Sequence, residues 1–143
     1  MNILKNEIIK AFPPSPVYFT YTGDQWVDWQ DIPNSFIIKD EFFIDLLSEK
    51  ELFLYVPRMM IFSLDDLEEK YLTDSNVVNI FLYRLLYYKE FNCLKYSNID
   101  QNNLIESFLD YIFKQHIYSE ITEDYQITKR ELIASGCWRH PFK

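Results

Sequence analysis

The apolar run at residues 52–64 places the strongest constraint on how this chain can fold. Arg58 is the only charged residue in the run. A segment of this composition is stable only when it leaves water, so we expect it to form the central element of the core. It is too short to cross a bilayer, because a membrane-spanning helix needs about 20 apolar residues. The rest of the chain must therefore cover this run.

The other segments have mainly helical patterns and contain no repeat or linker. We therefore expect a single domain, residues 1–143, with a mostly α fold: a compact bundle of about five to six helices. Met60, Phe81 and Phe108 are expected to point into its core. The stretches with helical spacing or caps are 2–12, 25–31, 40–48, 59–70, 76–90, 101–117 and a last one after Thr122.

Two stretches, residues 17–21 and 52–56, are rich in apolar, β-branched or aromatic residues and are candidates for one short two-stranded β element. Pro57 suits the first turn of a helix, where its missing N–H is not needed. We therefore expect the chain to change there from extended to helical. Asp24 and Asp100 are expected to cap the helices that follow them.

Composition excludes several functions. The only glycines are Gly23 and Gly136, whereas phosphate-binding loops need several close together. The net charge of −8 disfavours nucleic acid and anionic membranes and favours a basic partner. With two cysteines and no apolar signal region at the N-terminus, we expect a soluble cytoplasmic protein with reduced thiols and no cofactor.

Four pieces of the chain resemble, in order, an uncharacterised family of small bacterial domains. They are the end of the first helix at residues 11–13, the turn at 29–33, the apolar core at 53–60, and the segment from 99–101 to 107–111. The resemblance implies structural features and brings no activity or ligand. In size and charge the chain is also similar to bacterial immunity proteins, which neutralise toxins.

One spacing suggests a metal. Cys137 and His140 form a Cys-x-x-His pair, and Cys93 with His116 would complete two thiolates and two imidazoles for zinc. Metal-dependent enzyme chemistry at these four residues is thus one alternative function. The competing interpretation is a buried cysteine, a histidine at a helix end and a loose tail, because Cys93 and His116 are far apart in sequence.

Other polar groups also have two interpretations. Glu106 and Asp110 lie one helical turn apart and could share a proton or a cation, although a pair of Asp110 with Lys114 is the simpler account. The acids at residues 65–69 would form either a solvated helix face or a surface that steers a basic partner. Tyrosines near them suit either a protein interface or the rim of the core, with their hydroxyl groups outward. The candidate partner-binding residues are Asp65, Asp66, Glu68, Glu69, Tyr83 and Tyr87.

The sequence favours a non-catalytic, acidic protein-binding module, with toxin neutralisation as one form of this role. The metal-dependent enzyme is the first alternative. The second alternative is a structural homo-oligomer whose exposed aromatic residues form its own interface. Nothing in the sequence positively supports catalysis, because no nucleophile lies in a recognisable arrangement with a base.

Overall fold

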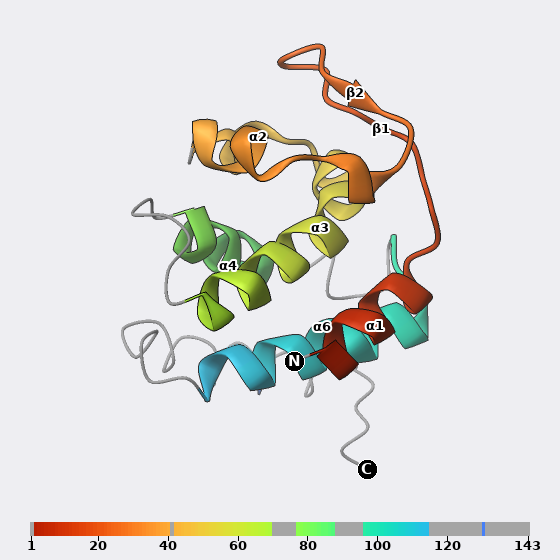
Figure 1. Cartoon of the computed structure of the whole chain (residues 1–143), viewed down its shortest axis with the longest axis vertical. Coiled ribbons are helices and arrows are strands. Elements are labelled where there is room, and N and C mark those ends of the chain that lie inside the picture. The colour runs from red at the N-terminus through yellow and green to blue at the C-terminus, as the bar shows by residue number, and fades with distance from the viewer. Residues whose placement is uncertain (1, 41, 70–76, 88–95, 115–129, 131–143) are drawn as a thin grey trace.

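The structure is a computed structural model that describes residues 2–40, 42–69, 77–87, 96–114 and 130 (Figure 1). These residues form five α-helices, two 3-10 helices (η) and one two-stranded antiparallel sheet. In chain order the elements are α1 (Asn2–Ala11), β1 (Val17–Tyr18), β2 (Gln25–Trp26), η1 (Trp29–Asp31), α2 (Asn34–Lys39), η2 (Phe43–Leu46), α3 (Glu49–Glu68), α4 (Val77–Tyr87) and α6 (Ile99–Phe113). The mostly α fold with a short two-stranded element is confirmed. The helix expected after Thr122 lies outside the described residues.

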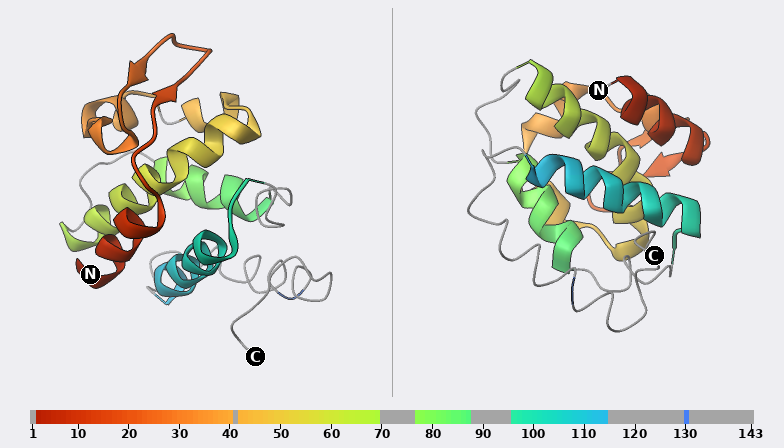
Figure 2. Two further views of the ribbon diagram at one scale, coloured as in Figure 1. Left: turned by 90° about the vertical axis from the view of Figure 1, so that its right-hand side faces the viewer. Right: turned by 90° about the horizontal axis from the view of Figure 1, so that it is seen from below.

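Helix α3 is the central element, and it contains the whole apolar run. It packs against α1, η1, β1 and α4 (Figures 1 and 2). Its buried side chains recur at helical spacing, and each of these five is at most 1% exposed: Leu52, Tyr55, Val56, Met59 and Met60. Burial of this stripe excludes water from the middle of the molecule.

The expectation that residues 52–56 form a strand is wrong, because α3 begins at Glu49 and runs through them. Ser48 starts the helix: its side chain accepts from the Glu51 N–H, while the Glu51 carboxylate accepts from the Ser48 N–H. This capping box satisfies two N–H groups that a helix start leaves unpaired. Pro57 therefore lies inside α3 and not in its first turn, and it is buried.

The helices α1, α4 and α6 complete the helical core. Helix α1 lies alongside both α3 and α6, and α4 contacts α3 (Figure 2). The rings of Phe81 on α4 and Phe108 on α6 are 6.3 Å apart, centroid to centroid. Both phenylalanines and Met60 are fully buried, as expected. The apolar stripe of α6 is also confirmed, since Leu104, Ile105, Phe108, Leu109 and Ile112 are all buried.

Residues 25–31 do not form the expected helix. Gly23, with a φ of +76°, reverses the chain, and its N–H donates to the Phe19 carbonyl. A left-handed turn of this kind favours glycine. The reversal pairs β1 with β2 in the register Val17 to Trp26 and Tyr18 to Gln25. We call residues 16–27 the hairpin.

Phe19 fastens the hairpin to the core. It is fully buried, and its ring meets four others at centroid distances of 5.0 to 6.1 Å: those of Trp26, Phe36, Phe43 and Tyr55. Three of these contacts are edge-to-face, an arrangement that aromatic rings favour. The hairpin is thus held by its inner face.

Two further boundaries differ from expectation. Instead of one helix over residues 40–48, the chain forms α2 earlier and then the short η2. The buried Arg84 supports η2, because its guanidinium donates to the carbonyls of Ile44 and Leu47. Helix α6 is capped by Asn98, one turn before Gln101, and Asp100 lies in its first turn instead of capping it.

We expect Phe19→Ala to lower the free energy of unfolding by about 3–5 kcal/mol, because it leaves a cavity among four rings. The matched control is Tyr21→Ala in the same hairpin. Tyr21 is 67% exposed, so its loss should change stability by no more than about 0.5 kcal/mol. Urea unfolding followed by tryptophan fluorescence measures both. Equal effects would show that the hairpin is not held through Phe19.

Candidate functional site

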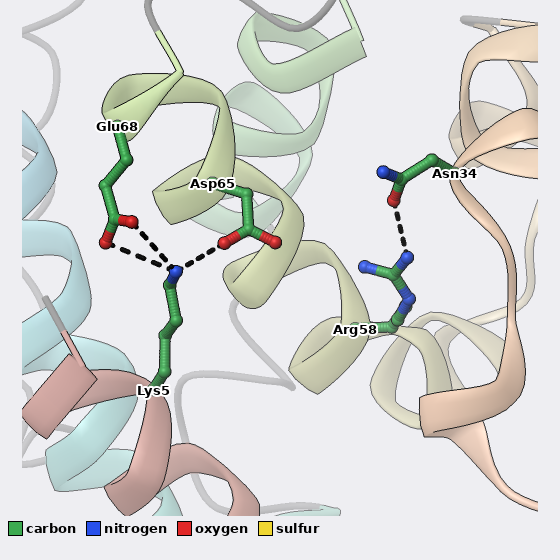
Figure 3. Close-up of polar contacts among 5 residues, drawn as sticks. All are labelled: Lys5, Asn34, Arg58, Asp65 and Glu68. Carbon is green, nitrogen blue, oxygen red and sulfur yellow. Dashed lines mark hydrogen bonds and ion pairs between the residues drawn. The ribbon is translucent and has the colours of Figure 1, made fainter.

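The four acids expected to form one solvated face are in different environments. Asp66 is only 5% exposed, so the prediction that it belongs to a solvated face is wrong. Asp65 and Glu68 are partly exposed and both form ion pairs with Lys5 of α1, at 3.2 Å for Glu68 (Figure 3). Glu69 is exposed. Ion pairs at the end of α3 therefore help to hold α1 against it.

Lys5 keeps its positive charge in this cluster. Its partial burial would lower its pKa, but the hydrogen bonds and negative charges of Asp65 and Glu68 outweigh that effect and raise the pKa above the ordinary value. Two carboxylates and one ammonium leave a local charge of −1. The cluster therefore offers a basic partner less charge than four free acids would.

We expect Asp66→Lys to destabilise the fold by about 3–5 kcal/mol, because it buries an ammonium where the protein has a carboxylate. Glu69→Lys introduces the same charge change three residues further along the chain. Because Glu69 is exposed, we expect that variant to lie within about 0.5 kcal/mol of the wild type. Urea unfolding at neutral pH compares them. Two equally stable variants would contradict the burial of Asp66.

The other expected groups are only partly described. Tyr83 is 40% exposed on α4, whereas the side chain of Tyr87 lies outside the description. Glu106 is buried and Asp110 is half-buried on α6. Cys93, His116, Cys137 and His140 all lie outside the described residues, so the zinc site stays a prediction. Within the described ranges, no group of three or more potential metal ligands occurs.

The outer side of the hairpin is the most distinctive surface of the described residues. Tyr18, Tyr21 and Val27 are 53%, 67% and 85% exposed. Next to them is a hollow of about 540 Å³, lined by Pro16, Val17, Tyr18, Gln25, Trp26 and Val27. Aromatic and aliphatic side chains exposed together mark interaction sites more often than single exposed residues do. We call Tyr18, Tyr21, Val27 and the hollow the hairpin surface.

Sequence reasoning missed this surface because it assigned residues 25–31 to a helix. A signal was present: an aromatic and β-branched stretch, then Thr22-Gly23-Asp24, then a second stretch with Trp26 and Val27. Two such stretches separated by a short turn containing glycine are typical of a hairpin. If these residues form a hairpin and not a helix, the side chains of Tyr18 and Val27 need not be buried.

Two contacts outside the aromatic cluster hold the hairpin in place. The Glu51 carboxylate accepts from the Thr20 N–H at 2.8 Å, in addition to its capping bond at the start of α3. The indole N–H of Trp29 donates to the carbonyls of Phe12 and Pro13, at 3.2 and 3.3 Å. The hairpin surface is therefore presented on a fixed support.

Glu51 makes the stability of the attachment between the hairpin and α3 dependent on pH. Partial burial would raise its pKa, but the N–H groups of Thr20 and Ser48 stabilise the carboxylate and lower the pKa below the ordinary value of 4.5. A carboxyl group with a lowered pKa adds stability at higher pH. That contribution is lost as the pH falls below about 4.5 and through the folded-state pKa.

We expect Glu51→Gln to lower the free energy of unfolding by about 1 kcal/mol at pH 7, since a neutral amide replaces a charged acceptor of two backbone N–H groups. The difference should shrink as the pH falls from about 5 to 3, because the wild-type carboxylate becomes protonated. Urea unfolding across this range measures it. A difference that stays constant with pH would contradict the role of the Glu51 charge.

The charge around the hairpin has one sign. Residues 11–38 contain Asp24, Asp28 and Asp31 but no Lys, Arg or His. One cation reaches this segment from α3: Arg58 donates to the carbonyl of Ile32 and to the side chain of Asn34, at 2.7 and 2.6 Å (Figure 3). Its burial lowers the pKa of Arg58. The hairpin surface is therefore made of uncharged side chains, and the charged residues next to it in the sequence, Asp24 and Asp28, are negative.

No protein-family model matches this sequence, and comparisons with curated proteins and with solved structures gave no match. Among the described residues, no helix is both long enough and apolar enough to span a membrane.

Proposed function

We propose that this protein is a non-catalytic binding module that engages a basic protein partner through the hairpin surface. The observation that carries the proposal is the exposure of Tyr18, Tyr21 and Val27 on one hairpin, with Tyr18 and Val27 lining the hollow. An inhibitor that neutralises a toxin with a basic surface is one form of this function. The proposal keeps the acidic binding role expected from the sequence and moves its main contact surface from α3 and α4 to the hairpin.

The side chains support a protein partner. Tyrosine and tryptophan contribute much of the binding energy of protein interfaces, because they bury large areas and lose little conformational entropy. Val27, at 85% exposed, gains the full benefit of burial only when a partner covers it. The Phe19 cluster and Glu51 already fix the hairpin, so binding need not order it first.

The charges support a basic partner. Asp24 and Asp28 lie on either side of Gln25-Trp26-Val27, and the whole chain carries a net charge of −8. A field of this sign raises the association rate of a cationic protein and repels an anionic one, and salt screens the effect. The same field opposes a structural homo-oligomer joined through two hairpins, because it brings like charges together.

Differential capture tests the proposal. The hairpin variant is Tyr18→Ser, Tyr21→Ser and Val27→Ser. The control variant, Ile3→Ser and Ile99→Ser, removes exposed apolar side chains elsewhere, since Ile3 is 75% and Ile99 47% exposed. Wild type and both variants are immobilised, exposed to native lysate at low salt and compared by quantitative mass spectrometry.

We expect a basic protein that wild type and control retain equally and that the hairpin variant retains at least about 30-fold less, the effect of losing a hot spot. Its retention should fall as salt is raised. If every captured protein is retained equally by all three baits, the hairpin surface is not the binding site. Circular dichroism of the three proteins verifies that the substitutions leave the fold intact.

A further inference from the structure

Among the described residues, no backbone group bonds to the outer side of β2. The Phe19 N–H donates to the Asp24 carbonyl across the hairpin at 3.0 Å. In an antiparallel pair, residues alternate between facing the partner strand and facing away from it. The alternation set by Phe19 and Asp24 turns Trp26 toward β1 and turns the N–H and C=O groups of Gln25 and Val27 outward. We call this outward backbone of residues 25–27 the β2 edge.

The two edges of the hairpin differ in their contacts with the rest of the described structure. The outward N–H of Thr20, on the β1 side, donates to Glu51 at the start of α3, and β1 packs against α3. In the described part of the chain the sheet has only two strands, so no strand lies beyond β2. The hairpin projects at one end of the molecule, with β2 labelled on its outer side (Figure 1). An edge of this kind is a template for another strand.

The side chains beside the β2 edge specify which strand fits. Asp24 precedes β2 and Asp28 follows the bend at Val27, so the two aspartates lie on either side of the edge. Between them lie the exposed Val27 and the hollow lined in part by Tyr18 and Trp26. A matching strand therefore has cationic side chains about four residues apart and apolar side chains between them. The side chain of Asp28 also accepts from the Ser15 N–H, at 3.3 Å.

We infer that the partner binds by adding an extended basic segment to the β2 edge as a third strand. This inference rests on the proposed function and names the class of ligand: a Lys- or Arg-containing strand whose apolar side chains enter the hollow. The outward N–H and C=O groups of Gln25 and Val27 supply main-chain hydrogen bonds, and the hollow supplies side-chain selectivity. Asp24 and Asp28 favour cations at its two ends.

The probe is a short peptide of alternating lysine and valine, added to the full ¹⁵N-labelled protein. We expect the amide resonances of Gln25 and Val27 to shift most and their hydrogen exchange to slow, with weaker binding as salt is raised. A glutamate-for-lysine peptide should bind at least about tenfold more weakly, because its charges are repelled. A proline-for-valine peptide keeps the charge but cannot form a β ladder, and it should lose binding to a similar extent.

The matched protein variants are Val27→Pro and Val27→Thr. Both substituents are close to valine in size, but only Val27→Pro removes an outward N–H, which edge strands tolerate. We expect Val27→Pro to bind the lysine–valine peptide at least about tenfold more weakly than Val27→Thr. Far-ultraviolet circular dichroism verifies both folds, and the peptide series gives the answer if Val27→Pro does not fold.

The outcomes separate strand addition from binding in general. Equal binding of the lysine–valine and proline peptides, or shifts confined to residues outside the hairpin, would overturn strand addition. So would self-association of the wild type that Val27→Pro abolishes, since the edge would then pair with a second copy. If a captured protein is lost with the Tyr18, Tyr21 and Val27 triple variant but retained by Val27→Pro, the proposed function stands and strand addition does not.

Discussion

Burial of α3 is the constraint on which the rest of the structure depends. Its stripe from Leu52 to Met60 is almost completely inaccessible, and α1, α4, β1 and η1 all pack against it. A segment this apolar contributes most of its hydrophobic free energy only when every side is covered. The short outer elements gain their own stability by covering it, since most of them are too short to be stable alone in water.

One residue of α3 links this core to the candidate site. Glu51 completes the capping box with Ser48 and also accepts from the N–H of Thr20 in the hairpin. The start of the central helix and the position of the hairpin are thus fixed by the same carboxylate. Phe19 adds the apolar part of the connection through its ring contacts with Phe43 and Tyr55. The inner side of the hairpin thus carries its stability, while Tyr18 and Val27 are exposed.

Several features of the core could be predicted from residue patterns. The helical spacing on α6 and α4 identified the faces that are buried, and Met60, Phe81 and Phe108 are inside as expected. The start of α3 was also readable, because Ser48 and Glu51 have the capping-box spacing. It was missed because Pro57 suggested a later start. Proline disfavours a helix interior by about 3 kcal/mol, and burial of α3 on several sides outweighs that cost.

The region around the candidate site was less predictable, because the sequence pattern of its residues fits two different local structures. Trp26 and Trp29 are three residues apart, which fits one helical face, yet the pairing of Val17 with Trp26 places them in a strand and in η1. Asp66 has charged neighbours in sequence and is buried by the packing of α3. Local sequence does not contain the partners that decide such cases.

The sequence alone determined that the chain is mostly helical, acidic and built around residues 52–64, because these properties follow from composition and from spacing along one segment. Only the tertiary structure decided that Phe19 and Glu51 join the hairpin to α3. It also decided that Tyr18, Tyr21 and Val27 are exposed together. The physical reason is that pairing and burial depend on contacts between residues far apart in sequence, whereas helical periodicity is a property of each segment by itself.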